Sequence, residues 1–493
     1  MANQPNILLI VSDQERQRSW LPESAQLPQR QRLLDQGLEF TRYYTHSSPC
    51  SPSRATLFTG QYVPQHGVSD NVIFPGHRPL SMETPTLGHV LRKQGYYTAY
   101  LGKWHLALGS DPDMEAYGFG DWTGNDLHYM GWAGTGTGFD PMIADQASAW
   151  LDTNAQMDAP WFLTVAMVNP HDVMWFPIDQ PGYREAHPEE FAGVESLLRA
   201  ARWKDGDVVP IFDLPYDEHF DTLPDNFDDD LHTKPEVQRR WLHEQQHRYW
   251  GYIDPADRKS WLRHLDYYVK LHEMGDQSLG KVLDALGRSG CEDDTVVIYT
   301  SDHGDMCGSH GLRAKGPFLY EEIMNVPLYI KVPGSTTPGT RTTALASHVD
   351  LAQTIAGFGG SGRQPSMVGE DLSPLFGDPS GSVRDHVLFS QDSVWFPPLE
   401  PTRYAMRGFT DGRYKYARYY GIGGGINTYG QVSEREKQVD LDSPFEDHDH
   451  EFYDLQEDPG ELVNLAMDRS RRAQTREQFE RLLELESEFA PLA

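Results

Sequence analysis

Short apolar runs alternate with helix-like segments along the first three quarters of the chain, and this alternation limits the fold more than any other feature. The candidate strands cover residues 6–11, 98–101, 162–168, 295–300 and 328–332. Helical patterns lie between several of them, as in residues 84–94 and 261–286. The pattern predicts an α/β domain whose mainly parallel sheet is covered by helices on both faces. Ligands of such sheets collect at the carboxyl ends of strands, so polar residues directly after a strand are the first site candidates.

Residues 174–258 depart from this alternation. They are rich in Pro, Trp, Asp and His and show little periodicity. Structureless stretches of this length inside a domain are often functional, so we expect an insertion that covers the domain as a substrate lid. Its aromatic side chains could wall a substrate by stacking, or they could form a small core within the insertion. These aromatic residues are Trp175, Phe176, Trp203, Trp241 and Trp250.

The last quarter of the chain has a different pattern of expected strands and helices. Residues 407–416 are typical of a hairpin around Asp411-Gly412, a strong turn signal between β-prone flanks. A charged helix is expected from residue 469 to residue 489. We therefore expect a catalytic domain over residues 1–384 and a C-terminal subdomain over 385–493, built from a small antiparallel sheet and a helix.

Composition and local motifs disfavour several classes of function. Lys and Arg number 42 against 73 Asp and Glu, so the formal net charge is −31 and binding to nucleic acid or anionic lipid is not expected. The three cysteines, Cys50, Cys291 and Cys307, exclude a disulfide framework. The Gly-rich residues 134–140 and 421–427 do not join a strand to a helix. We expect flexible loops there, not a dinucleotide-binding fingerprint.

No segment of the sequence is typical of a membrane span or a secretion signal. The apolar run at residues 7–11 is far shorter than the ~18 residues that a spanning helix needs. No basic region or small-residue cleavage site surrounds it. We expect a soluble, cytoplasmic protein without a membrane partner, and the sequence leaves open whether it forms a homo-oligomer.

The sharpest motif surrounds Cys50. A lone cysteine is usually a buried small hydrophobic residue, but its neighbours argue otherwise here. The segment reads Pro49-Cys50-Ser51-Pro52-Ser53-Arg54-Ala55-Thr56-Leu57-Phe58-Thr59-Gly60. It resembles the signature of the type I sulfatases, which belong to the alkaline phosphatase superfamily. The resemblance implies that a formylglycine-generating enzyme recognises this segment during maturation and oxidises Cys50 to formylglycine.

Further motifs extend the resemblance over nearly the whole chain, in the family's order. It implies an alkaline phosphatase-like fold and the hydrolysis of small-molecule sulfate monoesters, such as aryl, small alkyl or sugar sulfates. The matching segments are Ser12-Asp13-Gln14, Gly102-Lys103-Trp104-His105-Leu106, Asn169-Pro170-His171-Asp172, Ser301-Asp302-His303-Gly304, Lys315, Glu451-Phe452-Tyr453-Asp454-Leu455 and Asp458-Pro459.

The chemistry of a sulfate ester accounts for these residue types. The substrate is an anion, so its sulfuryl oxygens must be neutralised by fixed cations, for which Arg54, Lys103 and Lys315 are the candidates. Formylglycine hydrates to a gem-diol, and a metal ion helps to ionise one hydroxyl for attack. By resemblance, His105 is the base that reforms the aldehyde and His171 is the acid or donor at the leaving oxygen. Two further residues are expected to bind the substrate: Asn71 and His310.

The expected metal ligands are Asp13, Gln14, Asp302, His303 and an oxygen on converted Cys50. Many arylsulfatases have a second Asp where this chain has Gln14, and an Asn where it has His303. Fewer carboxylates and one imidazole shift the preference from calcium toward manganese or zinc. We expect one divalent ion, Ca²⁺ or Mn²⁺. The Asp-Gln and Asp-His pairs are similar to those of choline-sulfatases and phosphonate monoester hydrolases.

Two other functions compete with this interpretation. A phosphonate monoester hydrolase or phosphodiesterase could use the same scaffold, because phosphoryl and sulfuryl groups are both tetrahedral. Lys103 and His105 favour sulfate monoesters, since the phosphonate hydrolases of this pattern tend to carry hydroxyl residues there. The second alternative is a non-catalytic binding protein in which Cys50 stays unconverted. A binder would have little reason to keep every polar group of a demanding site.

Overall fold

A seven-stranded sheet forms the centre of the molecule. The computed structural model describes residues 4–73, 77–189, 214–242, 250–392, 403–421 and 439–490. Within these residues, no helix has the length and apolar character needed to cross a membrane. In spatial order, the strands are β4 (Tyr97–Gly102), β5 (Trp161–Pro170), β1 (Asn6–Asp13), β6 (Thr295–Ser301), β7 (Leu328–Lys331), β2 (Leu38–Phe40) and β8 (Thr340–Thr342). Only β7 runs antiparallel to its neighbours, so the sheet is mainly parallel as expected.

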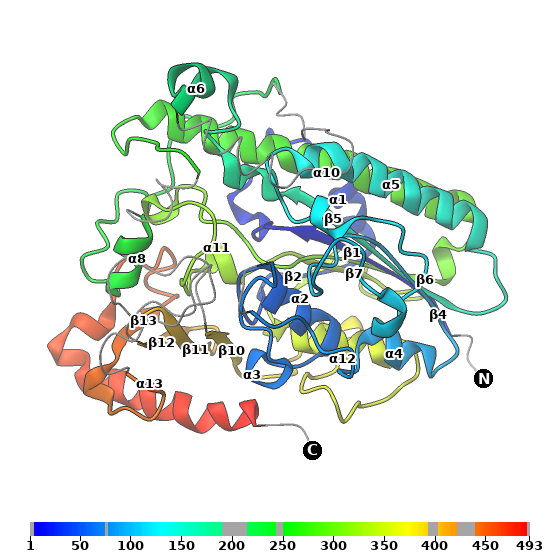
Figure 1. The fold of residues 1–493 in the computed structure, drawn as a ribbon. Helices are drawn as coiled ribbons and strands as arrows, with labels where there is room; N and C mark the ends of the chain where they lie inside the picture. The colour runs from blue at the N-terminus through cyan, green and yellow to red at the C-terminus, as the bar shows by residue number, and fades with distance from the viewer. Residues whose placement is uncertain are drawn as a thin grey trace.

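Helices cover both faces of this sheet (Figure 1). The apolar run of β1 is continuous because both faces are buried: Ile7, Leu9 and Val11 enter one hydrophobic core, while Leu8 and Ile10 enter the other. On the second side lie α1 (Pro28–Gln36), α5 (Thr135–Asn154) and α10 (Arg258–Ser289). On the first side lie α2 (Cys50–Thr59), α4 (Leu87–Arg92) and α12 (His348–Phe358).

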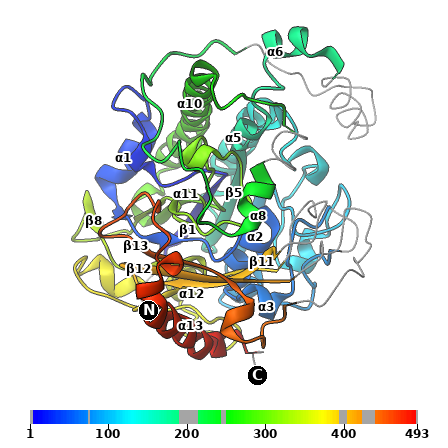
Figure 2. The ribbon, with the colours of Figure 1, turned by 90° about the vertical axis from the view of Figure 1, so that its left-hand side faces the viewer.

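A four-stranded antiparallel sheet follows the central one in the chain, at the lower left of Figure 1 and across the bottom of Figure 2. It consists of β10 (Val387–Gln391), β11 (Ala405–Thr410), β12 (Tyr414–Tyr420) and β13 (Asp449–Asp454). Helix α13 (Arg472–Leu485) packs Phe479 and Leu482 on one face of this sheet. Alternate residues such as Phe389 and Tyr419 belong to a core shared with the catalytic region. The small sheet is therefore bound to the catalytic region by a common core.

A buried polar group, here named the Lys415 cluster, also joins the two parts. It comprises Lys234, Glu321, Lys415, Glu451 and Glu461. The ammonium of Lys415 lies 2.6 Å from Glu321 and 2.8 Å from Glu461. Two tyrosine hydroxyls and the amide of a glutamine donate hydrogen bonds to Glu451. The cluster thus links the catalytic region, the segment after residue 213 and the small sheet.

The predicted strands and the α/β class are confirmed, whereas one loop prediction is wrong. Residues 134–140 open helix α5, with Gly134 as its N-cap at φ 74°. The carboxylate of Asp172 accepts the N–H groups of Gly136 and Thr137, which satisfies the helix start where no side-chain cap exists. Of the second Gly-rich segment, residues 422–427 lie outside the described residues. The remaining short elements are α3 (Val63–His66), α6 (Pro181–Ala186), α8 (Glu236–Arg240), α11 (Glu321–Met324), β3 (Tyr43–Tyr44) and β9 (Ala346–Ser347).

Candidate active site

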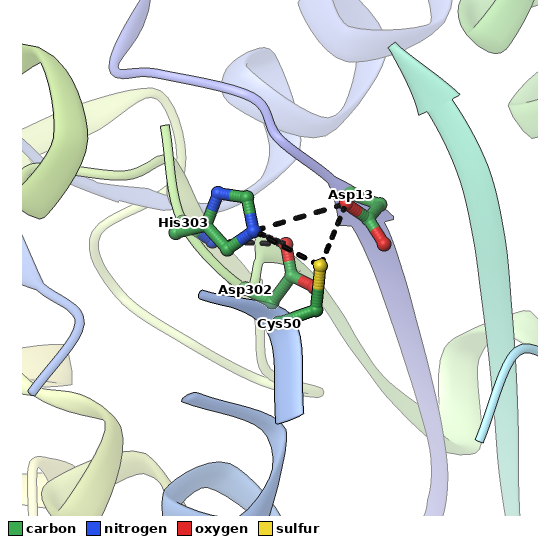
Figure 3. A group of neighbouring side chains, drawn as sticks. All are labelled: Asp13, Cys50, Asp302 and His303. Carbon is green, nitrogen blue, oxygen red and sulfur yellow. Dashed lines mark hydrogen bonds and ion pairs between the residues drawn. The ribbon is translucent and has the colours of Figure 1, made fainter. Parts of the chain in front are cut away.

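The carboxyl ends of two adjacent strands and the start of one helix meet at the predicted site. Strands β1 and β6 are paired in parallel up to Ser12 and Ser301, so Asp13 and Asp302 follow side by side. Cys50 is the first residue of α2, a helix whose ten residues are all buried. Figure 3 shows the Cys50 side chain pointing from this helix toward Asp13 and His303. Strand pairing thus brings residues about three hundred positions apart to one point.

Asp13, Cys50, Asp302 and His303 form a group that could hold a metal ion. One potential ligand atom from each lies within 4.8 Å of the others. The Sγ atom of Cys50 lies 3.8 Å from Oδ1 of Asp13 and 3.3 Å from Nε2 of His303. All four residues are fully buried. Carboxylates with one imidazole suit a divalent cation, so this part of the predicted ligand set is brought together.

The surroundings of His303 fit metal binding. Its Nδ1 lies 2.9 Å from the carbonyl oxygen of Gly304, so the Nδ1–H donates there and leaves the Nε2 lone pair directed at the cluster. Burial lowers the pKa of His303 well below its usual value, and the charge of Lys315 lowers it further. A neutral imidazole is the form that binds a metal.

Gln14 occupies a constrained position beside this group. Its φ of 67° lies in the left-handed region, and its N–H donates to Oδ1 of Asp302 at 3.1 Å. The side-chain oxygen accepts a hydrogen bond from Lys315 at 2.5 Å, and the amide nitrogen donates to Asp305 at 2.5 Å. In this arrangement Gln14 orients Lys315, and its role as a metal ligand stays a prediction.

Two lysines and one arginine surround the same point. Nζ of Lys103 lies 3.7 Å, and Nζ of Lys315 3.4 Å, from the sulfur of Cys50. Arg54 is directed elsewhere: its Nε and Nη2 donate to Asp302 at 2.9 Å and to Asp13 at 3.2 Å. Both lysines therefore lie beside the nucleophile position, and Lys103 also forms an ion pair with Asp13. Arg54 fixes the two carboxylates.

The charges around Cys50 shift one another's pKa values. Burial alone would raise the pKa of Asp13, but Lys103 and other nearby cations hold it well below its usual value. Burial alone would lower the pKa of Lys103, yet the charge of Asp13 raises it. Burial, and then the negative charge of Asp13, raise the pKa of the Cys50 thiol. The site thus holds Asp13 and Lys103 in their charged forms and disfavours a thiolate.

The two predicted catalytic histidines lie in the same buried region. Burial lowers the pKa of His105 and of His171 well below the usual value, and Lys103 and Lys315, respectively, lower them further. Nε2 of His171 accepts a hydrogen bond from Lys315 at 3.0 Å. Among the described residues, neither ring nitrogen of His105 has a hydrogen-bond partner. Both imidazoles are therefore neutral here and able to accept a proton.

The two predicted substrate-binding residues differ in position. The side-chain oxygen of Asn71 accepts the N–H of Ser51 at 3.0 Å, beside Cys50 at the start of α2. His310 instead lies with Asp229, 2.7 Å from Nδ1, and stacks on Tyr320 at 3.9 Å. These contacts belong to the surroundings of the Lys415 cluster. Substrate binding by either residue stays a prediction.

Several residues that hold the site were not found from the sequence. Asp126 accepts backbone N–H groups beside His105, and Asp305 accepts the amide of Gln14. Gly131 has φ 90°, and a Cβ atom there would come within 2.3 Å of the His171 ring. Only Asp305 had a local signal, because it follows Asp302-His303-Gly304 directly. The other two act through contacts that a linear motif does not contain.

The aromatic residues of the insertion are mostly core. Trp175, Trp241 and Trp250 join one buried cluster and Phe176 another, as the alternative interpretation proposed, while Trp203 lies outside the described residues. Trp241 also lines a narrow cavity together with Lys315 and Gln391.

Comparison with known proteins adds to this geometry. A model of a family described as Sulfatase matches residues 5–361, and one described as N-sulphoglucosamine sulphohydrolase, C-terminal, matches residues 308–427. The chain is 27% identical over 372 residues to the uncharacterized sulfatase YidJ of Escherichia coli. That match covers 69% of this chain and 64% of that protein.

Two further relatives carry names of activities. The chain is 25% identical to the N-acetylglucosamine-6-O-sulfatase of Bacteroides thetaiotaomicron, over 94% of this chain and 82% of that protein. It is 26% identical to the choline-sulfatase of Rhizobium meliloti, over 75% and 71% respectively. The solved phosphonate monoester hydrolase of Silicibacter pomeroyi superposes with a TM-score of 0.71, covering 99% of this chain and 96% of that one. At 21% identity, this last likeness shows the fold alone.

Proposed function

The chain belongs to the sulfatase family, and from that premise we propose that the cluster around Cys50 hydrolyses small-molecule sulfate esters with formylglycine at position 50 and one divalent metal ion. The family resemblance of the motifs is confirmed, and hydrolysis of sulfate esters follows from the family and its named relatives. One observation carries the finer proposal: Asp13, Lys103, Lys315 and His303 all lie 3.3 to 3.8 Å from the sulfur of Cys50.

The residues of the chain have separable tasks in this proposal. When present, formylglycine and the metal ion would supply an ionised hydroxyl as the nucleophile. Asp13, Asp302 and His303 would hold the ion, and Arg54 fixes the two carboxylates through its hydrogen bonds. The ammonium groups of Lys103 and Lys315 neutralise the sulfuryl oxygens of the substrate. Because these groups are buried and fixed, they need no rearrangement as charge develops.

Two histidines move protons at the ends of the reaction. His171 is hydrogen-bonded to Lys315, and together they can supply a proton to the leaving oxygen. His105 lies among the charges of Lys103, Arg54 and Asp13, and its neutral ring can accept a proton from the group at position 50. Removal of His105 should slow the second half of the reaction. The expected result in rapid mixing with an aryl sulfate is a burst of phenol equal to the enzyme concentration.

The substrate is proposed to be a sulfate ester of a small ring or a small alkyl group. The named relatives act on N-acetylglucosamine-6-O-sulfate and choline sulfate, according to their names, which supports esters of this size. The metal is proposed to be Ca²⁺ or Mn²⁺, because the donor set mixes carboxylates with one imidazole.

Phosphonate monoester hydrolysis is the competing activity. Its support is the shared fold with the Silicibacter pomeroyi enzyme. Against it stand Lys103 and His105, the two residues that favour a sulfate monoester. A panel of aryl, sugar and choline sulfates and phosphonate esters, compared by kcat/KM, decides between the two. If a phosphonate ester gives a higher kcat/KM than every sulfate ester, phosphonate ester hydrolysis is the main activity.

The nucleophile provides the direct test. Cys50→Ser, expressed where serine is not oxidised, should abolish turnover and leave the melting temperature unchanged, because the side chains are similar in size and the carboxylate and ammonium groups around Cys50 can hydrogen-bond a hydroxyl. Wild-type chain made without the formylglycine-generating enzyme should be similarly inactive. Mass spectrometry of the peptide that contains Cys50 separates converted from unconverted protein, and absence of conversion in active enzyme would refute the proposal.

A further inference from the structure

His105 has a backbone conformation that its residue type disfavours. Its φ of 61° lies in the left-handed region, where a Cβ atom crowds the following carbonyl oxygen. The side chain is 1% exposed, and among the described residues its ring nitrogens accept or donate no hydrogen bond. Hydrogen bonds to the ring therefore do not fix the orientation of the imidazole. Its orientation depends on what holds the peptide groups on either side.

One carboxylate holds the peptide on the N-terminal side. Oδ1 of Asp126 accepts the N–H of Trp104 at 2.9 Å and the N–H of His105 at 3.1 Å, and Oδ2 lies 2.9 Å from the same His105 nitrogen. Asp126 is fully buried, and no ion pair involves it within the described part of the chain. Its carboxylate oxygens therefore accept hydrogen bonds from the peptide N–H groups of Trp104 and His105.

Two further sets of hydrogen bonds hold this backbone segment, one at the carbonyl group of His105 and one at the backbone of Asp126. The hydroxyl of Ser51, next to Cys50, donates to the carbonyl oxygen of His105 at 2.6 Å. Asp126 is itself positioned by its backbone, which donates to Ser110 at 2.9 Å and accepts from Tyr129 at 3.1 Å. The peptide groups of His105 are therefore held between Asp126 and the helix that carries the nucleophile position.

We propose that Asp126 is a positioning residue for sulfate ester hydrolysis, because it holds the backbone of His105 in a left-handed conformation beside Ser51, the residue next to Cys50. The inference rests on the proposed function, since it assigns the effect of Asp126 to the proton-transfer role of His105. Without the carboxylate, two buried N–H groups lose their acceptor and the turn relaxes toward an ordinary φ. The imidazole then leaves its position although every catalytic side chain is still present.

The first test compares variants by kcat and KM. Asp126→Ala should lower kcat roughly a hundredfold, as misplacing a catalytic group by about 1 Å does, with KM little changed. Asp126→Asn keeps one oxygen as acceptor and should lose only about tenfold. Asp113→Ala is the matched control, because Asp113 also accepts a backbone N–H, from Ala116 at 3.2 Å, but is exposed. The control should keep the wild-type kcat.

A double-mutant cycle separates positioning from a general loss of stability. Asp126→Ala also destabilises the fold, so a lower melting temperature alone proves nothing. If Asp126 acts through His105, adding Asp126→Ala to His105→Ala should change kcat by less than about threefold. A full hundredfold loss in that background would overturn the proposal, because it would mean that Asp126 acts on some other group.

A crystal structure of the variant gives a readout that does not depend on activity. In Asp126→Ala, or in Asp126→Asn if the alanine variant does not fold, the φ of His105 should leave the left-handed region and its ring should move. An unchanged His105 overturns the positioning role even if activity falls. Inactivity of the converted wild-type enzyme on every sulfate ester would refute the proposed function instead, and the structure of the variant would still decide whether Asp126 holds the turn.

Discussion

The site around Cys50 and the Lys415 cluster are both buried groups of charged side chains, but their charges are satisfied in different ways. Around Cys50, the cations Arg54, Lys103 and Lys315 face the carboxylates Asp13 and Asp302. In the Lys415 cluster, Lys415 pairs with Glu321 and Glu461, and Lys234 lies 3.6 Å from Asp229. Neutral tyrosine and glutamine donors surround the remaining carboxylate, that of Glu451. The charges of the Lys415 cluster are therefore satisfied by other groups of the folded chain. The active site keeps an excess of positive charge for a substrate anion, in a chain whose net charge is −31.

Removal of a proposed metal ligand from the site around Cys50 should have the largest effect on activity. Asp13→Asn and His303→Ala each take a donor from the proposed metal group, so metal content and activity should fall together, by more than the roughly 10–100-fold that outer-shell changes cost. Elemental analysis and kcat/KM measure the two effects. Full metal stoichiometry in both variants would contradict the ligand assignment.

Removal of Lys415 should lower the stability of the fold and leave activity unchanged. Lys415→Met leaves Glu321 and Glu461 without their ammonium group, and breaking a buried pair in this way costs about 3–5 kcal/mol of unfolding free energy. Urea unfolding measures this loss, and the kcat of the folded fraction should be unchanged. Lys331→Met is the control, because its partly exposed pair with Glu292 should contribute less than about 1 kcal/mol.

Removal of Lys315 should affect catalysis instead of stability. Lys315→Met takes away a cation directed at the position of Cys50, so kcat and kcat/KM should fall together by about 2.7–4 kcal/mol, or roughly a hundred- to a thousandfold. The melting temperature should stay close to wild type, because neighbouring cations remain to balance the carboxylates. A rise in KM alone would mean that Lys315 binds substrate and transition state equally. Lys270→Met, on the partly exposed face of α10, is the matched control.

The smallest expected effect is a pH dependence in the C-terminal subdomain. Burial alone would lower the pKa of His386, but hydrogen bonds to Glu488 and Asp385 raise it above its ordinary 6.5. The protonated pair therefore stabilises the fold fully below about pH 6.5, and this contribution is lost as the pH rises through the folded pKa. His386→Gln should cost about 1 kcal/mol at low pH, since the pair is partly exposed. A difference in melting temperature that stays constant from about pH 5 to about pH 9 would contradict this linkage.

The sequence was sufficient for those parts of the site that lie within short motifs. Cys50, Lys103 and Asp302 each stand in a segment whose neighbours indicate its chemistry, and short apolar runs identified the five principal strands. Strand β2 (Leu38–Phe40) was missed because three residues show no periodicity. The helical start at Gly134 was missed because its stabilising carboxylate, Asp172, is distant in sequence.

The supporting residues could not be predicted for a related reason. Asp126 accepts hydrogen bonds from peptide groups 21 and 22 residues away, and Gly131 matters only because the His171 ring packs against it. Arg54 was expected to face the sulfuryl group, but two carboxylates from different strands accept its hydrogen bonds. The contact partners of these residues are set by the tertiary fold, and sequence periodicity does not report them.

The complete burial of helix α2 also determines when the proposed oxidation of Cys50 could take place. Cys50 and the four residues after it are inaccessible once the helix has packed between the sheet and α12. An enzyme that reads this segment and oxidises its cysteine must therefore reach it on the nascent or unfolded chain. If Cys50 is oxidised as proposed, folding and maturation would compete in time, and a molecule that folds first would keep its thiol. The fraction of active protein in a preparation would then depend on how long the chain remained unfolded in the presence of the maturation enzyme.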